Sequence, residues 1–173
     1  MDRIAFEEFL MVYEKDIYSF CCYLDAERAA DLYQETVLAA FEMRQRIDPS
    51  QNPKSLLLGI AVGKLKNMRR KDARRQMIVP EIPLDDSGAD RLRDREPGPE
   101  DQLQATAVSE AVQKAVAGLD DKFRIPLILY YFDDSDLGSI AQICGVPMGT
   151  IKSRLHKGRA LVKAALEKEG FAP

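Results

Sequence analysis

The sequence has few of the residues on which metal, redox and nucleophilic sites are usually built. It contains three cysteines, Cys21, Cys22 and Cys144, and one histidine, His156. No Cys-x-x-Cys pair and no cysteine-to-histidine spacing of a zinc site occurs. Adjacent cysteines are poor disulfide partners, because the bridge needs a specific geometry. We therefore expect reduced, buried thiols, no metal ion and no cofactor.

Long apolar runs are also absent. The longest near-continuous apolar stretch, residues 56–63, is far shorter than the roughly 20 residues that a helix needs to cross a bilayer. The first residues carry acids at Glu7 and Glu8, where a secretory signal has a basic segment and then an apolar one. The sequence therefore predicts a cytoplasmic protein with no membrane insertion.

What is present indicates a folded, helical protein. Of the 173 residues, 46% are hydrophobic and 31% are charged, which is an ordinary balance for a globular chain. Apolar residues recur every three or four positions through most of the chain, and no segment alternates as a strand does. We predict an all-α fold with two small helical domains, residues 1–76 and 103–173. The segment between them, 77–102, is rich in proline, glycine and acids, which predicts a flexible acidic linker.

Turn and capping residues indicate where the helices begin and end. Asp25 and Asp120 each precede a predicted helix, and their carboxylates could accept hydrogen bonds from the free backbone amides of its first turn. Asn52 followed by Pro53 is typical of a helix cap and first helical residue, because proline there loses no needed hydrogen bond. Pro126 is expected to kink its helix.

Charge is strongly segregated along the chain, although the net charge is only −3. Residues 64–75 contain seven lysines and arginines against one acid, Asp72, and residues 152–163 contain five and no acid. Two such basic patches are typical of nucleic-acid binding. The alternative is a solvated basic helix face, although seven cations exceed what is needed to complement a helix dipole.

The second patch follows a helix-turn-helix pattern. A short helix over 135–143, a tight turn and a helix over 148–165 place Ala141 where helices touch, Gly145 in the turn, and Ile151 inward. Arginine and lysine can donate to guanine, and serine and threonine can bond bases or phosphates. The residues left to enter a major groove are Thr150, Lys152, Ser153, Arg154, His156 and Lys157.

This motif resembles domain four of the extracytoplasmic-function sigma factors of bacterial RNA polymerase. Residues 145–154, GVPMGTIKSR, are close to the usual family run Gly-Val-Pro-x-Gly-Thr-Val-Lys-Ser-Arg. Residues 29–35, AADLYQE, and 56–61, LLLGIA, resemble domain two of the same family. The two resemblances occur in the family's order and cover nearly all of the chain outside the linker.

The resemblance implies roles for particular residues. Domain four would contact the duplex minus-thirty-five element with the six residues named above, and the chain would bind the clamp coiled coil and the flap of core RNA polymerase. The implied clamp contacts are Asp31, Gln34 and Glu35, for which a solvated helix face is the alternative. The implied contacts to the melted single strand of the minus-ten element are Ile47, Asp48, Ser50, Asn52, Lys64, Lys66, Asn67, Arg69 and Arg70.

The predicted function is therefore that of a sigma factor that directs core polymerase to specific promoters and initiates transcription, with an anti-sigma factor as a further implied partner. The alternative is a stand-alone helix-turn-helix regulator, which would bind its site tightly without polymerase. An enzyme is not expected, because Cys22, Cys144 and His156 form no recognisable nucleophile-and-base set and no phosphate-binding glycine loop occurs.

Overall fold

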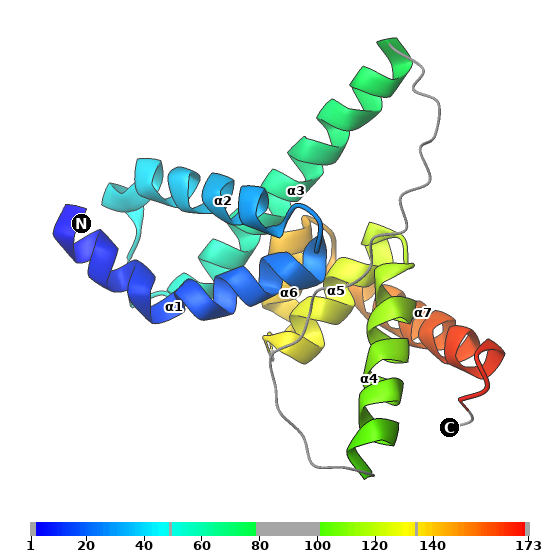
Figure 1. Ribbon diagram of the computed structural model, residues 1–173. Coiled ribbons are helices and arrows are strands. Elements are labelled where there is room, and N and C mark those ends of the chain that lie inside the picture. Colours follow the sequence, from blue (N-terminus) through cyan, green and yellow to red (C-terminus); the bar gives the residue numbers. More distant parts are fainter. Residues whose placement is uncertain (1–2, 49, 79–100, 134, 172–173) are drawn as a thin grey trace.

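The computed structural model describes residues 3–48, 50–78, 101–133 and 135–171, which form helices joined by short turns (Figure 1). No strand occurs within these residues, and the all-α prediction is confirmed. In chain order the elements are α1 (Arg3–Leu24), α2 (Ala29–Met43), the 3-10 turn η1 (Arg44–Arg46), α3 (Pro53–Ile78), α4 (Asp101–Ala117), α5 (Asp121–Phe132), α6 (Leu137–Cys144) and α7 (Met148–Lys168).

We call α1–α3 the N-terminal half and α4–α7 the C-terminal half. Most of the predicted linker, 77–102, lies outside the described residues. Its two ends are helical, because α3 runs to Ile78 and α4 begins at Asp101. No described helix is long and apolar enough to span a bilayer. Nowhere in the described ranges do three histidine, cysteine or acidic side chains come together as metal ligands could.

The predicted helix ends are partly confirmed. Asn52 caps α3, since its Oδ1 accepts a hydrogen bond from the Ser55 amide at 3.2 Å. Asp25 accepts from the Arg28 amide at 3.3 Å, but α2 begins only at Ala29, so the predicted start was one turn early. Asp120 lies at the N-cap position of α5, where the prediction of a side-chain cap was wrong. Its carboxylate pairs with Lys122 at 3.3 Å instead.

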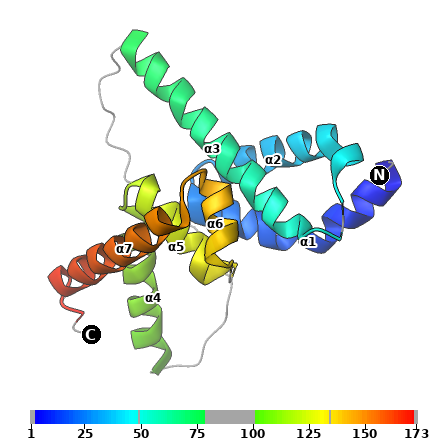
Figure 2. The ribbon, with the colours of Figure 1, turned by 180° about the vertical axis from the view of Figure 1, so that it is seen from behind.

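The two halves share one continuous core, and Figure 2 shows α5 and α6 lying against the N-terminal half, where α5 contacts α1 and α6 contacts α3. Phe132 at the end of α5 packs against Phe20 and Tyr23 of α1, with ring centroids 6.2 and 5.0 Å away. Helix α6 lies along α3, where a Cβ built on Gly59 would be 3.7 Å from Cγ1 of Ile143. The α5 helix continues past the buried Pro126 to Phe132. The C-terminal half is therefore seated on α1 and α3.

Candidate nucleic-acid interface

The first helix of the helix-turn-helix has a defined beginning and end. Asp136 accepts hydrogen bonds from the amides of Gly138 and Ser139 at 2.8 and 3.1 Å. With the Ser139 hydroxyl, which has the largest effect, these donors lower the pKa of Asp136. Helix α6 ends at Gly145, whose φ of 69° and ψ of 37° are left-handed and suit glycine. The Gly145 amide donates to the Ala141 carbonyl at 2.9 Å, so the turn is tight, as predicted.

The second helix, α7, presents the predicted recognition face. Ile151 and Leu155 are buried in the core and Val162 packs against it. Because these side chains point inward, the intervening positions on the first turns point outward. Of the six predicted duplex contacts, Lys152, Ser153, His156 and Lys157 are exposed, and Thr150 and Arg154 are half-buried. The structure thus brings all six to the first three turns of one helix.

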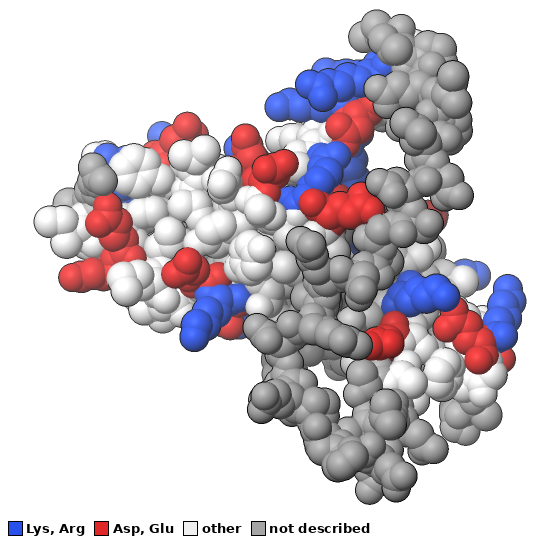
Figure 3. All heavy atoms as spheres, in the orientation of Figure 1, with Lys and Arg blue, Asp and Glu red and all other residues white. Residues whose placement is uncertain are grey.

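The first basic patch lies on the second half of α3. Lys66, Asn67 and Arg70 are exposed there, and Lys64 and Arg69 are half-buried. Figure 3 shows lysine and arginine side chains gathered along the end of this helix, with acids beside them. This is where a negatively charged strand would be attracted.

The predicted single-strand loop is distant from these cations. Asp48 accepts hydrogen bonds from the Ser50 amide and hydroxyl at 2.9 and 2.7 Å, and the Ser50 hydroxyl has the largest effect in lowering the pKa of Asp48. Ile47 is buried in the core, so its side chain offers no surface to a base. At 1.5 Å per helical residue, about 18 Å of α3 separates Asn52 from Lys64. The structure does not bring the two sets together around one base.

The predicted polymerase contacts face the basic patch across a groove that sequence reasoning missed. Asp31, Gln34 and Glu35 are exposed on α2, and Glu35 Oε2 lies 2.9 Å from Lys64 Nζ. This hydrogen bond and the Lys64 charge lower the pKa of Glu35. The groove has a volume of about 470 Å³. Its lining residues are Asp31, Gln34, Glu35, Leu38, Lys64, Asn67, Met68, Arg70, Lys71 and Arg74.

The two basic patches meet at the helix-turn-helix turn. Lys66 Nζ lies 3.4 Å from the carbonyl oxygen of Cys144. Burial, the largest effect, raises the pKa of the Cys144 thiol, while the charges of Lys66 and Arg154 oppose that rise. Lys66 from α3 and Arg154 from α7 are therefore both close to Cys144. No local sequence signal predicts this, because 78 residues separate Lys66 from Cys144.

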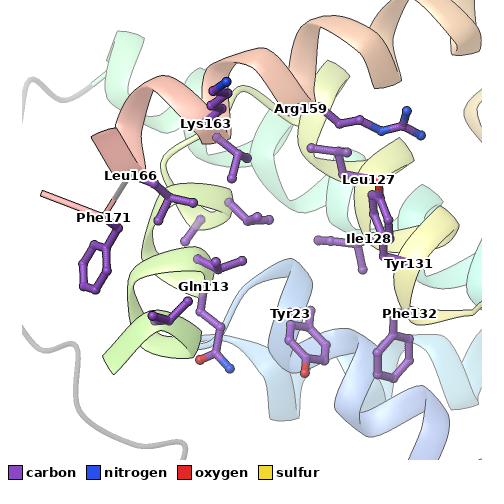
Figure 4. A pocket seen from close by; sticks show the side chains of 15 residues that line it. Tyr23, Gln113, Leu127, Ile128, Tyr131, Phe132, Arg159, Lys163, Leu166 and Phe171 are labelled. Carbon is purple, nitrogen blue, oxygen red and sulfur yellow. The ribbon is translucent and has the colours of Figure 1, made fainter. Parts of the chain in front are cut away.

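A second cavity, also missed from the sequence, opens between α4, α5 and α7 and has a volume of about 730 Å³ (Figure 4). Val112, Leu127, Ile128 and Leu166 give it an apolar lining. From the sequence pattern alone such residues are assigned to a core, because apolar periodicity does not show whether a helix face is packed against a neighbour or lines a cavity.

Comparison with known proteins agrees with this arrangement. Residues 10–75 match the Sigma-70 region 2 family model, and residues 109–162 match the Sigma-70 region 4 model. The sigma factor EcfG of Rhodopseudomonas palustris is 33% identical over 146 residues, which are 84% of this chain and 75% of that protein. The chain belongs to the extracytoplasmic-function sigma factors. SigW of Bacillus subtilis is 26% identical over 169 residues, covering 95% of this sigma factor and 90% of the relative.

Solved structures show the same fold. The sigma factor RpoE of Bartonella quintana, in complex with the anti-sigma factor NepR, superposes with a TM-score of 0.77 at 22% identity, covering 94% of this chain and 97% of that one. CnrH in complex with the cytosolic domain of CnrY gives a TM-score of 0.64 at 16% identity, over 96% and 90%. The family matches and the relative EcfG favour the sigma factor over the stand-alone regulator.

Proposed function

We propose that this sigma factor divides its work between three surfaces: the α7 face binds duplex DNA, the basic end of α3 binds single-stranded DNA, and the exposed face of α2 binds core RNA polymerase. The observation that carries the proposal is the helix-turn-helix, in which the left-handed Gly145 and the buried Ile151 turn six polar or basic side chains outward. A sigma factor acts on polymerase and chromosome, so we place it in the cytoplasm. Binding alone accounts for this function, and we propose no catalysis by the chain.

The α7 face has the chemistry for duplex readout. Arg154 can donate two hydrogen bonds to guanine, and Lys152 and Lys157 can neutralise phosphates. Ser153 already donates its hydroxyl to the Thr150 carbonyl at 2.9 Å, so we expect Ser153 to contribute less than Arg154. We therefore propose Arg154 as the main base-reading side chain.

The α2 face suits a helical partner. Asp31, Gln34 and Glu35 lie three and four residues apart, so they share one side of the helix. A basic helix laid beside them could pair with both acids. RpoE and CnrH are seen with NepR and CnrY, and we propose that an anti-sigma factor also holds the present chain.

Run-off transcription with core polymerase tests these roles. We expect Arg154→Ala with Lys157→Ala to weaken initiation by about fivefold or more, since a good base contact contributes about 1–3 kcal/mol, while co-purification with core polymerase is retained. Asp31→Ala with Gln34→Ala should reduce co-purification instead. Lys168→Ala and Glu8→Ala, exposed charges away from these faces, are the matched controls. Equal loss of polymerase binding by both double variants would overturn the assignment.

A further inference from the structure

We propose that two copies of this sigma factor pair through the outer face of α1, with the two helices antiparallel across a two-fold axis. The surface that carries the pairing is called the outer stripe. Its members are Ile4, Glu8, Met11, Val12, Lys15 and Tyr18, all of them exposed. The proposal is independent of the proposed function, because none of these residues belongs to the α7 face, the basic end of α3 or the α2 face.

The outer stripe lies opposite the core. Ile17 and Phe20 of α1 are buried, and 3.6 residues per turn put the stripe on the other side of the helix. Ile4, Met11 and Val12 are large apolar residues, yet they are 70%, 75% and 72% exposed. Each Å² of apolar surface left in water forgoes about 25 cal/mol. Clustered apolar exposure of this kind is typical of an interaction site.

The charges on the outer stripe make it complementary to itself. Glu8 and Lys15 lie on either side of the apolar centre at Met11 and Val12. They are about 10 Å apart along the helix at 1.5 Å per residue, which is beyond the three- or four-residue spacing at which helix neighbours pair. When the two-fold axis passes between Met11 and Val12, Glu8 of each copy faces Lys15 of the other. The apolar centres of both copies then meet at the axis.

This pattern favours a second copy over an unrelated partner. In a two-fold interface residue i of one copy contacts j of the other, and j contacts i, which is what the Glu8 and Lys15 positions satisfy. A parallel pair would instead place like charges beside each other, which is unfavourable.

The ends of the outer stripe also match. In the antiparallel pair Ile4 of one copy comes level with Tyr18 of the other. Tyr18 packs against Tyr33 of α2, with ring centroids 5.6 Å apart, so its ring is held in place before the partner arrives. Less side-chain entropy is then lost on pairing.

The pairing leaves the recognition helix free. Both ribbon views show the first turns of α1 at the opposite edge of the molecule from α7 (Figures 1 and 2). Glu7 and Glu14 are exposed beside the outer stripe, where their like charges oppose association. One helix from each copy also buries less than a standard interface, so we expect a dissociation constant of about 10–100 µM.

Sedimentation equilibrium of the full-length protein, from about 5 to about 500 µM, tests the pairing. Met11→Lys should raise the dissociation constant about tenfold or more, because the introduced charge meets its symmetry mate at the axis. The matched control is Met77→Lys, the same change at a methionine of α3 that is also exposed, and it should leave the dissociation constant unchanged. Circular dichroism checks that each variant keeps its helices.

Charge reversal tests the antiparallel geometry. Glu8→Lys makes the outer stripe wholly basic and Lys15→Glu makes it wholly acidic, so each variant alone should associate severalfold more weakly than the wild type. An equimolar mixture of the two variants should pair again, because every charge then faces its opposite. Low salt is used, since exposed ion pairs are screened by salt.

A wild type that stays monomeric at the highest concentration would overturn the proposal, and so would equal effects of Met11→Lys and Met77→Lys. If Met11→Lys loses helix, the mixture of the two charge variants decides, and failure of that mixture to associate overturns the antiparallel pair. A monomeric wild type in which Met11→Lys lowers co-purification with core polymerase would show that polymerase covers the outer stripe instead.

Discussion

Gly158, in the middle of α7, allows α5 to pack closely beneath the recognition helix. A Cβ built on it would lie 2.8 Å from Cδ1 and 3.2 Å from Cγ of Leu127, and 3.6 Å from Cβ of Phe123. Leu127 is only 4% exposed, and although it lines the neighbouring cavity, relief of the overlap would have to move its Cγ as well as its Cδ1. Gly63, inside α3, is the natural comparison, because nothing lies within 4 Å of its added Cβ.

These contacts predict opposite signs for one substitution. In a helix interior, alanine is favoured over glycine by about 1 kcal/mol, and Gly63→Ala should gain about that much. At Gly158 the new methyl overlaps Leu127, since carbon atoms prefer separations near 3.5–4.0 Å, and overpacking costs about 1–3 kcal/mol. We therefore expect Gly158→Ala to lose about 1 kcal/mol of unfolding free energy.

Urea unfolding followed by circular dichroism measures both changes, with equal m-values as the check that the unfolding transition is the same. A double-mutant cycle isolates the cause: in a Leu127→Ala background the overlap is gone, and Gly158→Ala should then stabilise by up to about 1 kcal/mol. If Gly158→Ala stabilises the wild type as much as Gly63→Ala does, the close approach of α5 and α7 is refuted.

Three further predictions concern the interface. Gly145→Ala should cost about 1 kcal/mol of unfolding free energy, since alanine is disfavoured at positive φ, and Gly145→Asn should cost less. Urea unfolding measures both costs, and equal costs would mean that the positive φ is not the cause. The pKa of Asp136 is lowered in the folded protein. The carboxylate therefore contributes its full stabilisation of the fold above the ordinary pKa of 3.8, and this contribution is lost as the pH falls through the lowered pKa. The thermal midpoints of wild type and Asp136→Asn should therefore converge in acid, and a constant gap would contradict this. Lys152→Ala should reduce the slope of log affinity against log salt for a minus-thirty-five duplex by about 1, and an unchanged slope would mean that Lys152 binds no phosphate.

Local features of the fold were predictable from the sequence because they depend on neighbouring residues. The helix-turn-helix follows from a left-handed Gly145 and an inward Ile151, and the beginning of α3 follows from Asn52 and Pro53. Asp120 shows the limit of that reasoning. A carboxylate before a helix can accept hydrogen bonds from the free amides of the first turn, but the carboxylate of Asp120 pairs with Lys122 instead. The neighbouring Asp121 makes the contact to Arg69.

Contacts between distant segments could not be predicted. Arg69 and Asp121 are 52 residues apart, and either charge could equally have faced solvent. The burial of Ile47 could not be predicted either: the family resemblance implied that it contacts the single strand, whereas the fold buries its side chain in the core. Knowing which residues are basic did not reveal that the patches on α3 and α7 meet at Cys144, because that depends on how α6 is seated on α3.

The last turns of α3 extend beyond the other helices in both ribbon views (Figures 1 and 2), and Arg70, Lys71, Arg74 and Arg75 are exposed there. A helix end that extends beyond its neighbours opens locally at little cost, and each of these four residues is a trypsin site. Among the described residues, we therefore expect trypsin to cut first in this segment. Because a bound single strand would cover the same side chains, the order in which the cuts disappear as oligonucleotide is added gives a residue-by-residue footprint of the strand.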